Sequence, residues 1–277
     1  MYWVELIVFD LDGTLLNKES AISDYTSETL RLLAEHQIAY TVATGRTLHS
    51  ARSVLGEHDF LLPQAYKNGV MTWHPEEMRF TKGAMLTMSE LDHVFRAFRY
   101  ADVTPLVFTL DEKQRSTVYH APLKSGIEQE LVSHAGLGDN LRTRALDELP
   151  GDAVITHVNA IGPCEAIETV LRSVNEEPQL VAYSGTLRDD RQWRWLDLHH
   201  SEASKGGAIA DLRDILGIER VICFGDSDND LSMFAVADES YAPANANDAI
   251  KAAATAVIGH HDEEGIARFL RERFKLN

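Results

Sequence analysis

The sequence predicts an α/β protein built on a parallel sheet, with a smaller α+β domain inserted into it. Short apolar runs near both ends of the chain stop abruptly at acidic loops, and a helical pattern separates the first two runs. The middle of the chain instead contains consecutive strand-like runs without intervening helices. The two ends of the chain are therefore expected to form one domain and the middle another.

The first part of the chain predicts a strand, a helix and a second strand. Residues 6–9 form a continuous apolar run, which suits a strand that is buried on both faces. Ser23 is a typical N-cap residue, and apolar residues recur after it at helical spacing. Residues 38–44 then predict a second buried strand. These elements form a βαβ unit with parallel strands, so Asp10 and Thr44 should lie at the same edge of the sheet.

Residues 83–198 are expected to form the inserted domain, and residues 1–82 and 199–277 the domain with the parallel sheet. Within the insertion, apolar residues at helical spacing predict a helix that begins after Ser89. Consecutive strands in this region predict antiparallel pairs. The further expected elements are strands at 105–109, 116–120, 153–158, 180–183 and 193–198, and a helix at 166–174.

The C-terminal part repeats the pattern of the N-terminal part. A helix is expected at 208–216, with Gly217 as its stop. A strand at 221–224 runs into Asp226, so a second predicted strand ends in carboxylates. A short strand at 256–258 and a closing helix at 266–274 complete the expected sheet domain.

With 26 Lys and Arg against 43 Asp and Glu, the chain has a formal net charge of −17. This charge repels phosphate backbones and anionic lipid surfaces, which argues against nucleic-acid and membrane partners. Cys164 and Cys223 have no spacing typical of a disulfide framework or a zinc site, so we expect a reducing, cytoplasmic location. Neither a signal peptide nor a membrane span is expected, because the N-terminus lacks a basic leader and no run of about 18 apolar residues occurs.

Two acidic loops follow predicted parallel strands, where α/β sheets bind their ligands. The loops read Asp10-Leu11-Asp12-Gly13-Thr14 and Asp226-Ser227-Asp228-Asn229-Asp230. Neither loop fits an EF-hand, because Leu15 or Leu231 stands at the sixth position, where that loop requires glycine. A single such loop is usually a solvated acidic turn. Two loops with converging carboxylates indicate a site for a hard cation.

Four motifs taken together resemble those of the haloacid dehalogenase-like hydrolases in order and spacing. They are Asp10-Leu11-Asp12-Gly13-Thr14-Leu15-Leu16, Thr44-Gly45-Arg46, Lys205-Gly206 and Gly225-Asp226-Ser227-Asp228-Asn229-Asp230. Asn68-Gly69 and Asn245-Ala246 are similar to the Cof-type phosphatase branch, although a Met-Gly-Asn run is more usual than the Pro243-Ala244-Asn245 of this chain. The resemblance implies a Rossmann-like core with an inserted α+β cap domain. It also implies a Mg²⁺-dependent phosphatase that forms an aspartyl-phosphate.

The resemblance assigns different tasks to the aspartates of these motifs. Asp10 would attack phosphorus as the nucleophile, and Asp12 would protonate the leaving alcohol and then take a proton from the attacking water. The attack needs a divalent cation, because a phosphate dianion repels a carboxylate nucleophile. The expected Mg²⁺ ligands are the side chains of Asp10 and Asp226 and the backbone carbonyl of Asp12. Asp230 is expected to orient Lys205 or a water molecule rather than to bind the metal directly.

Thr44 and Lys205 are expected to take part in catalysis by binding the phosphoryl oxygens. In isolation they would be an ordinary strand-end threonine and a solvated lysine. However, a lysine in a first helical turn opposes the helix dipole, which indicates a nearby anion. Gly45, Arg46 and Asn229 complete the expected phosphate-binding residues, although a plain surface position for Arg46 is equally compatible with the sequence.

Two further features leave alternatives open. Trp193 and Trp195 fall on one face of a predicted strand, either within the core of the inserted domain or as a stacking surface for a sugar or ring. The histidine pairs at 199–200 and 260–261 lack a metal-ligand pattern. They are expected to be exposed or hinge residues.

The sequence favours hydrolysis of a small phosphomonoester, such as a sugar phosphate or a related metabolite, with the inserted domain setting specificity. Phosphomutase-type transfer is one alternative, because phosphomannomutases carry a related cap and the same aspartate pair. A non-catalytic, phosphometabolite-binding regulator is another, although binding alone needs no nucleophile. True dehalogenation is disfavoured, because Asp12 and the acidic loop at 226–230 would then have no task. No P-loop or dinucleotide-binding motif is visible.

Overall fold

The computed structural model describes residues 4–56, 58, 60–135, 142–187 and 190–276, and the chain falls into two compact units. Unit 1 comprises Met1–Thr81 and Ser204–Asn277, and unit 2 comprises Lys82–Ala203. Unit 2 ends at Ala203, a few residues beyond the expected end of the inserted domain at residue 198. The reason is that strand β11 (Trp193–His200) continues past residue 198.

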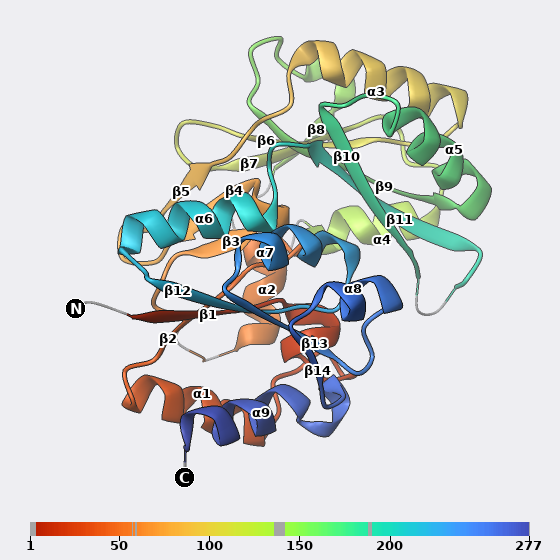
Figure 1. Ribbon diagram of the computed structural model, residues 1–277. Coiled ribbons are helices and arrows are strands. Elements are labelled where there is room, and N and C mark those ends of the chain that lie inside the picture. Colours follow the sequence, from red (N-terminus) through yellow and green to blue (C-terminus); the bar gives the residue numbers. More distant parts are fainter. Residues whose placement is uncertain (1–3, 57, 59, 136–141, 188–189, 277) are drawn as a thin grey trace. The chain divides into compact units, whose positions relative to one another are not determined.

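Unit 1 is built on a five-stranded sheet with the order β14-β13-β12-β1-β2. All its neighbouring strands are parallel (Figure 1), which confirms the predicted fold class. Through Leu6, the central strand β1 pairs with Val221 on one side and Ala39 on the other. The strands are β1 (Glu5–Phe9), β2 (Ala39–Val42), β12 (Arg220–Phe224), β13 (Glu239–Pro243) and β14 (Ala256–Ile258).

Helices cover both faces of this sheet, with α1 and α9 on one side and α6 and α7 on the other (Figure 1). Ile7 and Phe9 pack in the core with α1, α2 and α9, whereas Leu6 and Val8 pack in the core with α6, α7 and α8. Because both faces are covered, β1 is a continuous apolar run. No helix of the described residues has the length and apolar character to cross a membrane. The helices are α1 (Asp24–Glu35), α2 (Leu48–Leu55), α6 (Lys205–Leu216), α7 (Leu231–Val236), α8 (Asp248–Ala253) and α9 (Gly265–Phe274).

Local capping sets the limits of two of these helices. The Oγ of Ser23 accepts a 3.1 Å hydrogen bond from the backbone N–H of Thr26 at the start of α1. Gly217 ends α6 in the left-handed region, at φ +65°, where a Cβ would be strained. Both of these capping predictions are confirmed.

A small three-stranded sheet extends unit 1. A parallel bridge between Ala43 and Ala65 joins its first strand to the chain that follows β2. The turn η2 (Lys67–Gly69), which connects the first two strands, contains Asn68 in the left-handed region at φ +56°. The strands are β3 (Gln64–Tyr66), β4 (Met71–His74) and β5 (Arg79–Lys82).

Unit 2 contains a six-stranded sheet with the order β10-β11-β9-β6-β7-β8. Its pairs are antiparallel, as predicted, except that β7 and β8 are parallel. Strand β9 is longer than expected, because it pairs with β11 from Val158 to Pro163. The remaining strands are β6 (Leu106–Leu110), β7 (Ser116–His120), β8 (Arg142–Ala145), β9 (Ile155–Pro163) and β10 (Leu180–Thr186).

The first helix of unit 2 begins earlier than predicted. Thr87 rather than Ser89 precedes it, because Thr87 and Glu90 form a reciprocal capping box. The backbone N–H of Glu90 donates to Thr87 Oγ1 at 3.3 Å, and Glu90 Oε2 accepts from the Thr87 N–H at 2.7 Å. The helices of unit 2 are α3 (Met88–Tyr100), α4 (Gly126–Ala135) and α5 (Cys164–Val174).

Alternation along β11 separates the two faces of the unit 2 sheet. Leu196 and Leu198 belong to the core with α3 and α5. Trp195 is 40% exposed and packs on Gly185, where a Cβ would lie 2.8 Å from the indole, so the core interpretation of Trp195 is wrong. His199 is fully buried, so the expectation of an exposed or hinge residue is wrong there too, because the strand continues through it.

Gly206→Ala is expected to destabilise unit 1. A Cβ at Gly206, in the first turn of α6, would lie 2.1 Å from the backbone oxygen of Ser232 in α7. Overpacking of this kind costs about 1 to 3 kcal/mol, and we expect a loss near the upper end of that range in urea denaturation. Gly126→Ala is the control, because a Cβ at this helical glycine would meet nothing within 4 Å. Equal effects of the two substitutions would contradict the close approach of α6 and α7.

Candidate active site

The two acidic loops meet where the sequence order of the parallel strands changes direction. β1 and β12 are neighbours, and Asp10 and Asp226 stand just beyond their carboxyl ends. The Asp10 N–H donates a 2.9 Å hydrogen bond to the Phe224 carbonyl, so the pairing continues into the loop. From this point the chain continues to β2 on one side and to β13 on the other. Such a switch point is where α/β sheets bind ligands.

The loop after β1 forms one wide helical turn, η1 (Leu11–Leu15), and lies directly against the loop after β12. Gly13 has φ +77°, and a Cβ on it would lie 2.4 Å from Asp226 Oδ2. Thr14 Oγ1 donates a 3.2 Å hydrogen bond to Asp226 Oδ1. Both the backbone angle and the close approach therefore require glycine at position 13.

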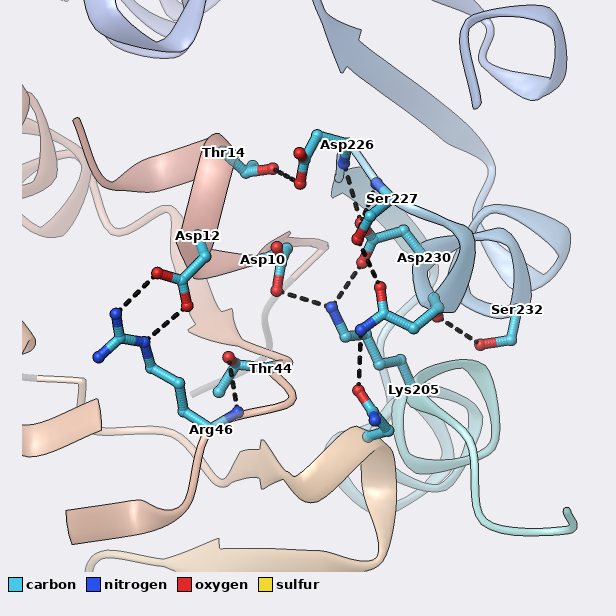
Figure 2. A network of polar contacts seen from close by, with 12 residues as sticks. Asp10, Asp12, Thr14, Thr44, Arg46, Lys205, Asp226, Ser227, Asp230 and Ser232 are labelled. Carbon is cyan, nitrogen blue, oxygen red and sulfur yellow. Dashed lines mark hydrogen bonds and ion pairs between the residues drawn. The ribbon is translucent and has the colours of Figure 1, made fainter. Parts of the chain in front are cut away.

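A buried ammonium group joins both loops to α6 (Figure 2). Lys205 is 0% exposed, and its Nζ donates to Asp10 Oδ1 and to Asp230 Oδ1, each at 2.6 Å. Asp230 Oδ2 accepts from the backbone N–H groups of Asp226, at 2.8 Å, and Ser227, at 3.0 Å. Lys205 is the first residue of α6, where a cation opposes the helix dipole. The two carboxylates compensate for this position.

Three carboxylates and one ammonium leave this cluster with a net negative charge. Ligand oxygens of Asp10, Asp226 and Asp230 lie within 4.8 Å of one another. Burial, and after it the Asp230 carboxylate, raises the pKa of Asp226 to about 6. Burial also raises the pKa of Asp10 well above its usual range, and Lys205 offsets this only in part. Burial alone would lower the pKa of Lys205, but Asp10 and Asp230 raise it, so the ammonium stays charged.

The donor atoms of this cluster fit a hard divalent cation. Within the described part of the chain, Asp10 uses Oδ1 for the ammonium and Asp226 uses Oδ1 for a threonine hydroxyl, so each keeps a second oxygen. Asp230 has both oxygens engaged and is the least suited of the three. Oxygen ligands with an excess of negative charge match the preference of Mg²⁺. The Asp12 side chain lies outside the cluster, and its expected backbone contribution stays a prediction.

The side chain of Asp12 points toward Arg46 (Figure 2). Arg46 Nε donates to Asp12 Oδ2 at 2.6 Å, and Nη2 donates to Oδ1 at 2.7 Å. These hydrogen bonds to the carboxylate raise the pKa of Arg46. Arg46 was predicted from the sequence to bind phosphate. In the structure its guanidinium lies against the Asp12 carboxylate.

The other residues expected to bind phosphate are Thr44, Gly45 and Asn229, and they lie close to Arg46 or Asn68. Thr44 is buried, and its Oγ1 accepts a 3.2 Å hydrogen bond from the Arg46 N–H, so the hydroxyl keeps its own hydrogen to donate. A Cβ on Gly45 would lie 3.2 Å from Asn68 Oδ1. Asn229 Nδ2 donates to the same Asn68 oxygen at 2.9 Å. Because the Asn68 N–H also donates to the Thr44 carbonyl at 3.0 Å, Asn68 connects the second motif to the fourth.

Comparison with known proteins identifies the family. A profile of the haloacid dehalogenase-like hydrolases matches residues 7–270. This chain belongs to that family. The 5-amino-6-(5-phospho-D-ribitylamino)uracil phosphatase YitU of Bacillus subtilis is 28% identical over 281 residues, which cover 98% of each chain. The pyridoxal phosphate phosphatase YbhA of Escherichia coli is 24% identical over 284 residues, which cover 96% of this chain and 97% of that protein.

Solved structures share the fold of this hydrolase along nearly its whole length. TM0651 from Thermotoga maritima superposes with a TM-score of 0.75 at 23% identity, covering 98% of this chain and 97% of the other. The subclass IIB sugar phosphatase BT4131 of the same superfamily superposes with a TM-score of 0.76 at 20% identity, covering 99% and 100%. The predicted membership of the haloacid dehalogenase-like hydrolases, in their Cof-type phosphatase branch, is confirmed.

Asn245 and His261 hold the first loop of this hydrolase in a way that the sequence did not predict. Asn245 Nδ2 donates to the Gly13 carbonyl at 2.7 Å, and Asn245 Oδ1 accepts from the His261 N–H at 3.1 Å. His261 Nδ1 lies 2.8 Å from the Leu16 carbonyl and the residue is half-buried, so His261 is not the exposed residue that was one of the two expectations. Because 232 residues separate Asn245 from Gly13, no local signal could have revealed this contact.

Asp226→Asn is expected to stabilise the metal-free hydrolase above about pH 6. The pKa of Asp226 is about 6 in the fold against 3.8 ordinarily, so the folded state binds this proton more tightly than the unfolded state. Ionisation of Asp226 therefore destabilises the fold progressively as the pH rises from about 4 to about 6. The loss in the free energy of unfolding reaches roughly 2 to 3 kcal/mol above that interval. Asparagine removes this charge and keeps an oxygen for Thr14.

Urea denaturation in EDTA, at several pH values between about 4 and 8, measures this difference. The gain of Asp226→Asn over wild type should grow from about pH 4 to 6 and then stay constant. Asp228→Asn is the control, because Asp228 is exposed in the same loop. A gain that is independent of pH, or that shrinks as the pH rises, would contradict an unfavourable buried charge at position 226.

Proposed function

We propose that the chain is a Mg²⁺-dependent phosphatase that hydrolyses a small phosphomonoester through an aspartyl-phosphate intermediate. The observation that carries this proposal is the position of Asp10, a buried carboxylate at the end of a central strand, 2.6 Å from Lys205 Nζ. A buried carboxylate in a cluster with excess negative charge destabilises a fold, and such groups are concentrated at functional sites. Membership of a hydrolase family supports the same proposal.

In the first step, a carboxylate oxygen of Asp10 forms a bond to phosphorus while the bond from phosphorus to the ester oxygen breaks. The bonding electrons stay on the ester oxygen, which takes a proton from the Asp12 carboxyl group. The alcohol leaves, and the phosphoryl group remains on Asp10. Asp10 and Asp12 stand two residues apart at the start of η1, so nucleophile and proton donor come from the same end of β1.

In the second step, a water oxygen attacks phosphorus while the Asp12 carboxylate accepts a proton from that water. The bond between phosphorus and the Asp10 oxygen breaks, and its electrons return to the carboxylate. The products are an alcohol and inorganic phosphate, and both aspartates regain their initial states. The covalent intermediate replaces one difficult displacement with two easier ones.

Thr44 and Lys205 would bind the phosphoryl oxygens. Lys205 Nζ carries three hydrogens, and Asp10 and Asp230 accept two of them, so the third can reach a phosphoryl oxygen. The Thr44 hydroxyl supplies a second donor. Gly45 and Asn229 would complete the phosphate site with N–H groups. Donors fixed in advance stabilise the charge that spreads over the phosphoryl oxygens during transfer.

The carboxylates of Asp10 and Asp226 would hold Mg²⁺, with the backbone carbonyl of Asp12 as a further protein ligand. When bound, Mg²⁺ would neutralise part of the negative charge of the carboxylates and the phosphoryl oxygens, which otherwise repel one another. Asp230 would not bind the metal directly. It would orient Lys205, to which it is hydrogen-bonded.

The proposed substrate is a small phosphorylated metabolite, such as a sugar phosphate. In support, YitU is named for a phosphoribityl compound and YbhA for pyridoxal phosphate. Unit 2 would act as the cap that sets specificity. The net charge of −17 argues against nucleic-acid and membrane partners, and two cysteines without disulfide spacing favour a cytoplasmic location.

Phosphate release from sugar phosphates, nucleotides and p-nitrophenyl phosphate tests the proposed function. We expect the wild type to hydrolyse members of this panel with Mg²⁺ and to lose activity in EDTA. Asp10→Asn should lower kcat by at least about 10³-fold, because the amide cannot form the acyl phosphate. Asp211→Asn is the matched control, because Asp211 is exposed on α6, and it should keep the wild-type rate.

Mass spectrometry of a quenched reaction should find phosphate on Asp10 of the wild type. Absence of phosphate release from every ester, by folded protein loaded with Mg²⁺, would contradict the phosphatase proposal. Phosphoryl transfer to a second substrate hydroxyl without phosphate release would indicate mutase chemistry instead.

A further inference from the structure

We propose that Arg46 is the positioning residue that holds Asp12 for proton transfer to the leaving group. This inference rests on the proposed phosphatase function, and it gives Arg46 a task other than binding the phosphoryl group. Its consequence is selectivity among esters. Hydrolysis of esters with poor leaving groups should depend on Arg46, whereas hydrolysis of activated esters should not.

Arg46 contacts Asp12 through two parallel hydrogen bonds. Nε lies 2.6 Å from Oδ2 and Nη2 lies 2.7 Å from Oδ1, so each carboxylate oxygen receives one N–H (Figure 2). A planar guanidinium matches a carboxylate in this arrangement and fixes its rotation as well as its place. A lysine at this position would supply charge without the two-point geometry.

Arg46 is itself held on its other side by α2. Nη1 donates to the backbone oxygen of Ser50 at 3.2 Å and to Ser50 Oγ at 3.3 Å. Ser50 belongs to the first turn of α2, and its N–H donates at 3.2 Å to the N-cap residue Thr47. Four of the five guanidinium hydrogens are thus engaged, which leaves little capacity for a phosphoryl group.

Asp12 depends on this support, because burial does not hold its carboxylate in place. Its φ and ψ of −74° and 121° interrupt the helical turn η1, and its side chain is 46% exposed. Among the described residues, Arg46 supplies the hydrogen bonds to its carboxylate. A carboxylate offers about four acceptor sites and the pair uses two, so both oxygens can still exchange a proton with a substrate.

Without Arg46, an exposed Asp12 would populate several rotamers, and the proton would be delivered from the wrong place. The cost depends on the ester. An alkyl phosphate expels an unstable alkoxide unless Asp12 transfers its proton to the ester oxygen as the bond to phosphorus breaks. In contrast, p-nitrophenolate is a stable anion that leaves with its bonding electrons and needs no proton.

Arg46→Gln tests the proposal through kcat/KM for an alkyl sugar phosphate and for p-nitrophenyl phosphate. For each ester, kcat/KM reports the steps up to alcohol release, in which Asp12 is the proton donor, and excludes the later water attack. We expect kcat/KM to fall about 10²-fold for the sugar phosphate and less than about threefold for p-nitrophenyl phosphate. Asp12→Asn should show the same selectivity, and the double variant should lose little more.

Two further variants control for charge and folding. Arg46→Lys keeps the charge but not the paired geometry, so it should retain most of the selective loss. Arg52→Gln is the matched control, because Arg52 lies in α2, the helix whose Ser50 contacts Arg46, but its own guanidinium lies 5.2 Å from the Trp73 ring centroid. Arg52→Gln should leave the ratio of kcat/KM for the sugar phosphate to kcat/KM for p-nitrophenyl phosphate at the wild-type value. Thermal melting verifies that each variant is folded.

An equal fall in kcat/KM for both esters would overturn the proposal and identify Arg46 as a phosphate-binding or purely structural residue. Wild-type values for both esters would overturn it as well. If Arg46→Gln does not fold, Arg46→Lys decides, and an unchanged ratio of the two substrates is then the contradicting result. Failure of the phosphatase function itself would look different, because the wild type would then hydrolyse neither ester.

Discussion

The arrangement of the site depends on the contacts of Lys205. Its fully buried ammonium lies 2.6 Å from Asp10 Oδ1 and from Asp230 Oδ1, which belong to the loops after two neighbouring strands. Loss of this ammonium would leave two buried carboxylates uncompensated, which costs about 3 to 5 kcal/mol in comparable cases. Because Lys205 is also the first residue of α6, the same contacts connect the start of that helix to the loops after β1 and β12.

The charge excess that Lys205 leaves uncompensated connects stability to function. Burial and Asp230 raise the pKa of Asp226 to about 6, so at neutral pH the fold holds a carboxylate that it disfavours. A divalent cation at Asp10 and Asp226 would remove this penalty. The charges that weaken the metal-free fold are thus the charges that would bind the metal and, in the proposed mechanism, form the covalent intermediate.

Elements with a strong local signal could be predicted, whereas weakly patterned ones could not. The apolar run of β1, the cap at Ser23 and the stop at Gly217 depend on adjacent residues, and all three agree with the structure. Strand β8 carries no apolar alternation, because all of its residues are exposed at the edge of its sheet. The start of α3 was misplaced because Ser89 and Thr87 are both good N-cap residues, and the partner Glu90 favours Thr87.

The sequence by itself determined the α/β class, the hydrolase family and the residue types of the candidate site, because these lie in short motifs at strand ends. Only the tertiary structure decided how those side chains pair. Arg46 lies on Asp12, 34 positions away, and Asn245 lies on the Gly13 carbonyl, 232 positions away. Such pairs leave no trace in local composition or periodicity, since they arise only when parallel strands bring separate loops to one edge of the sheet.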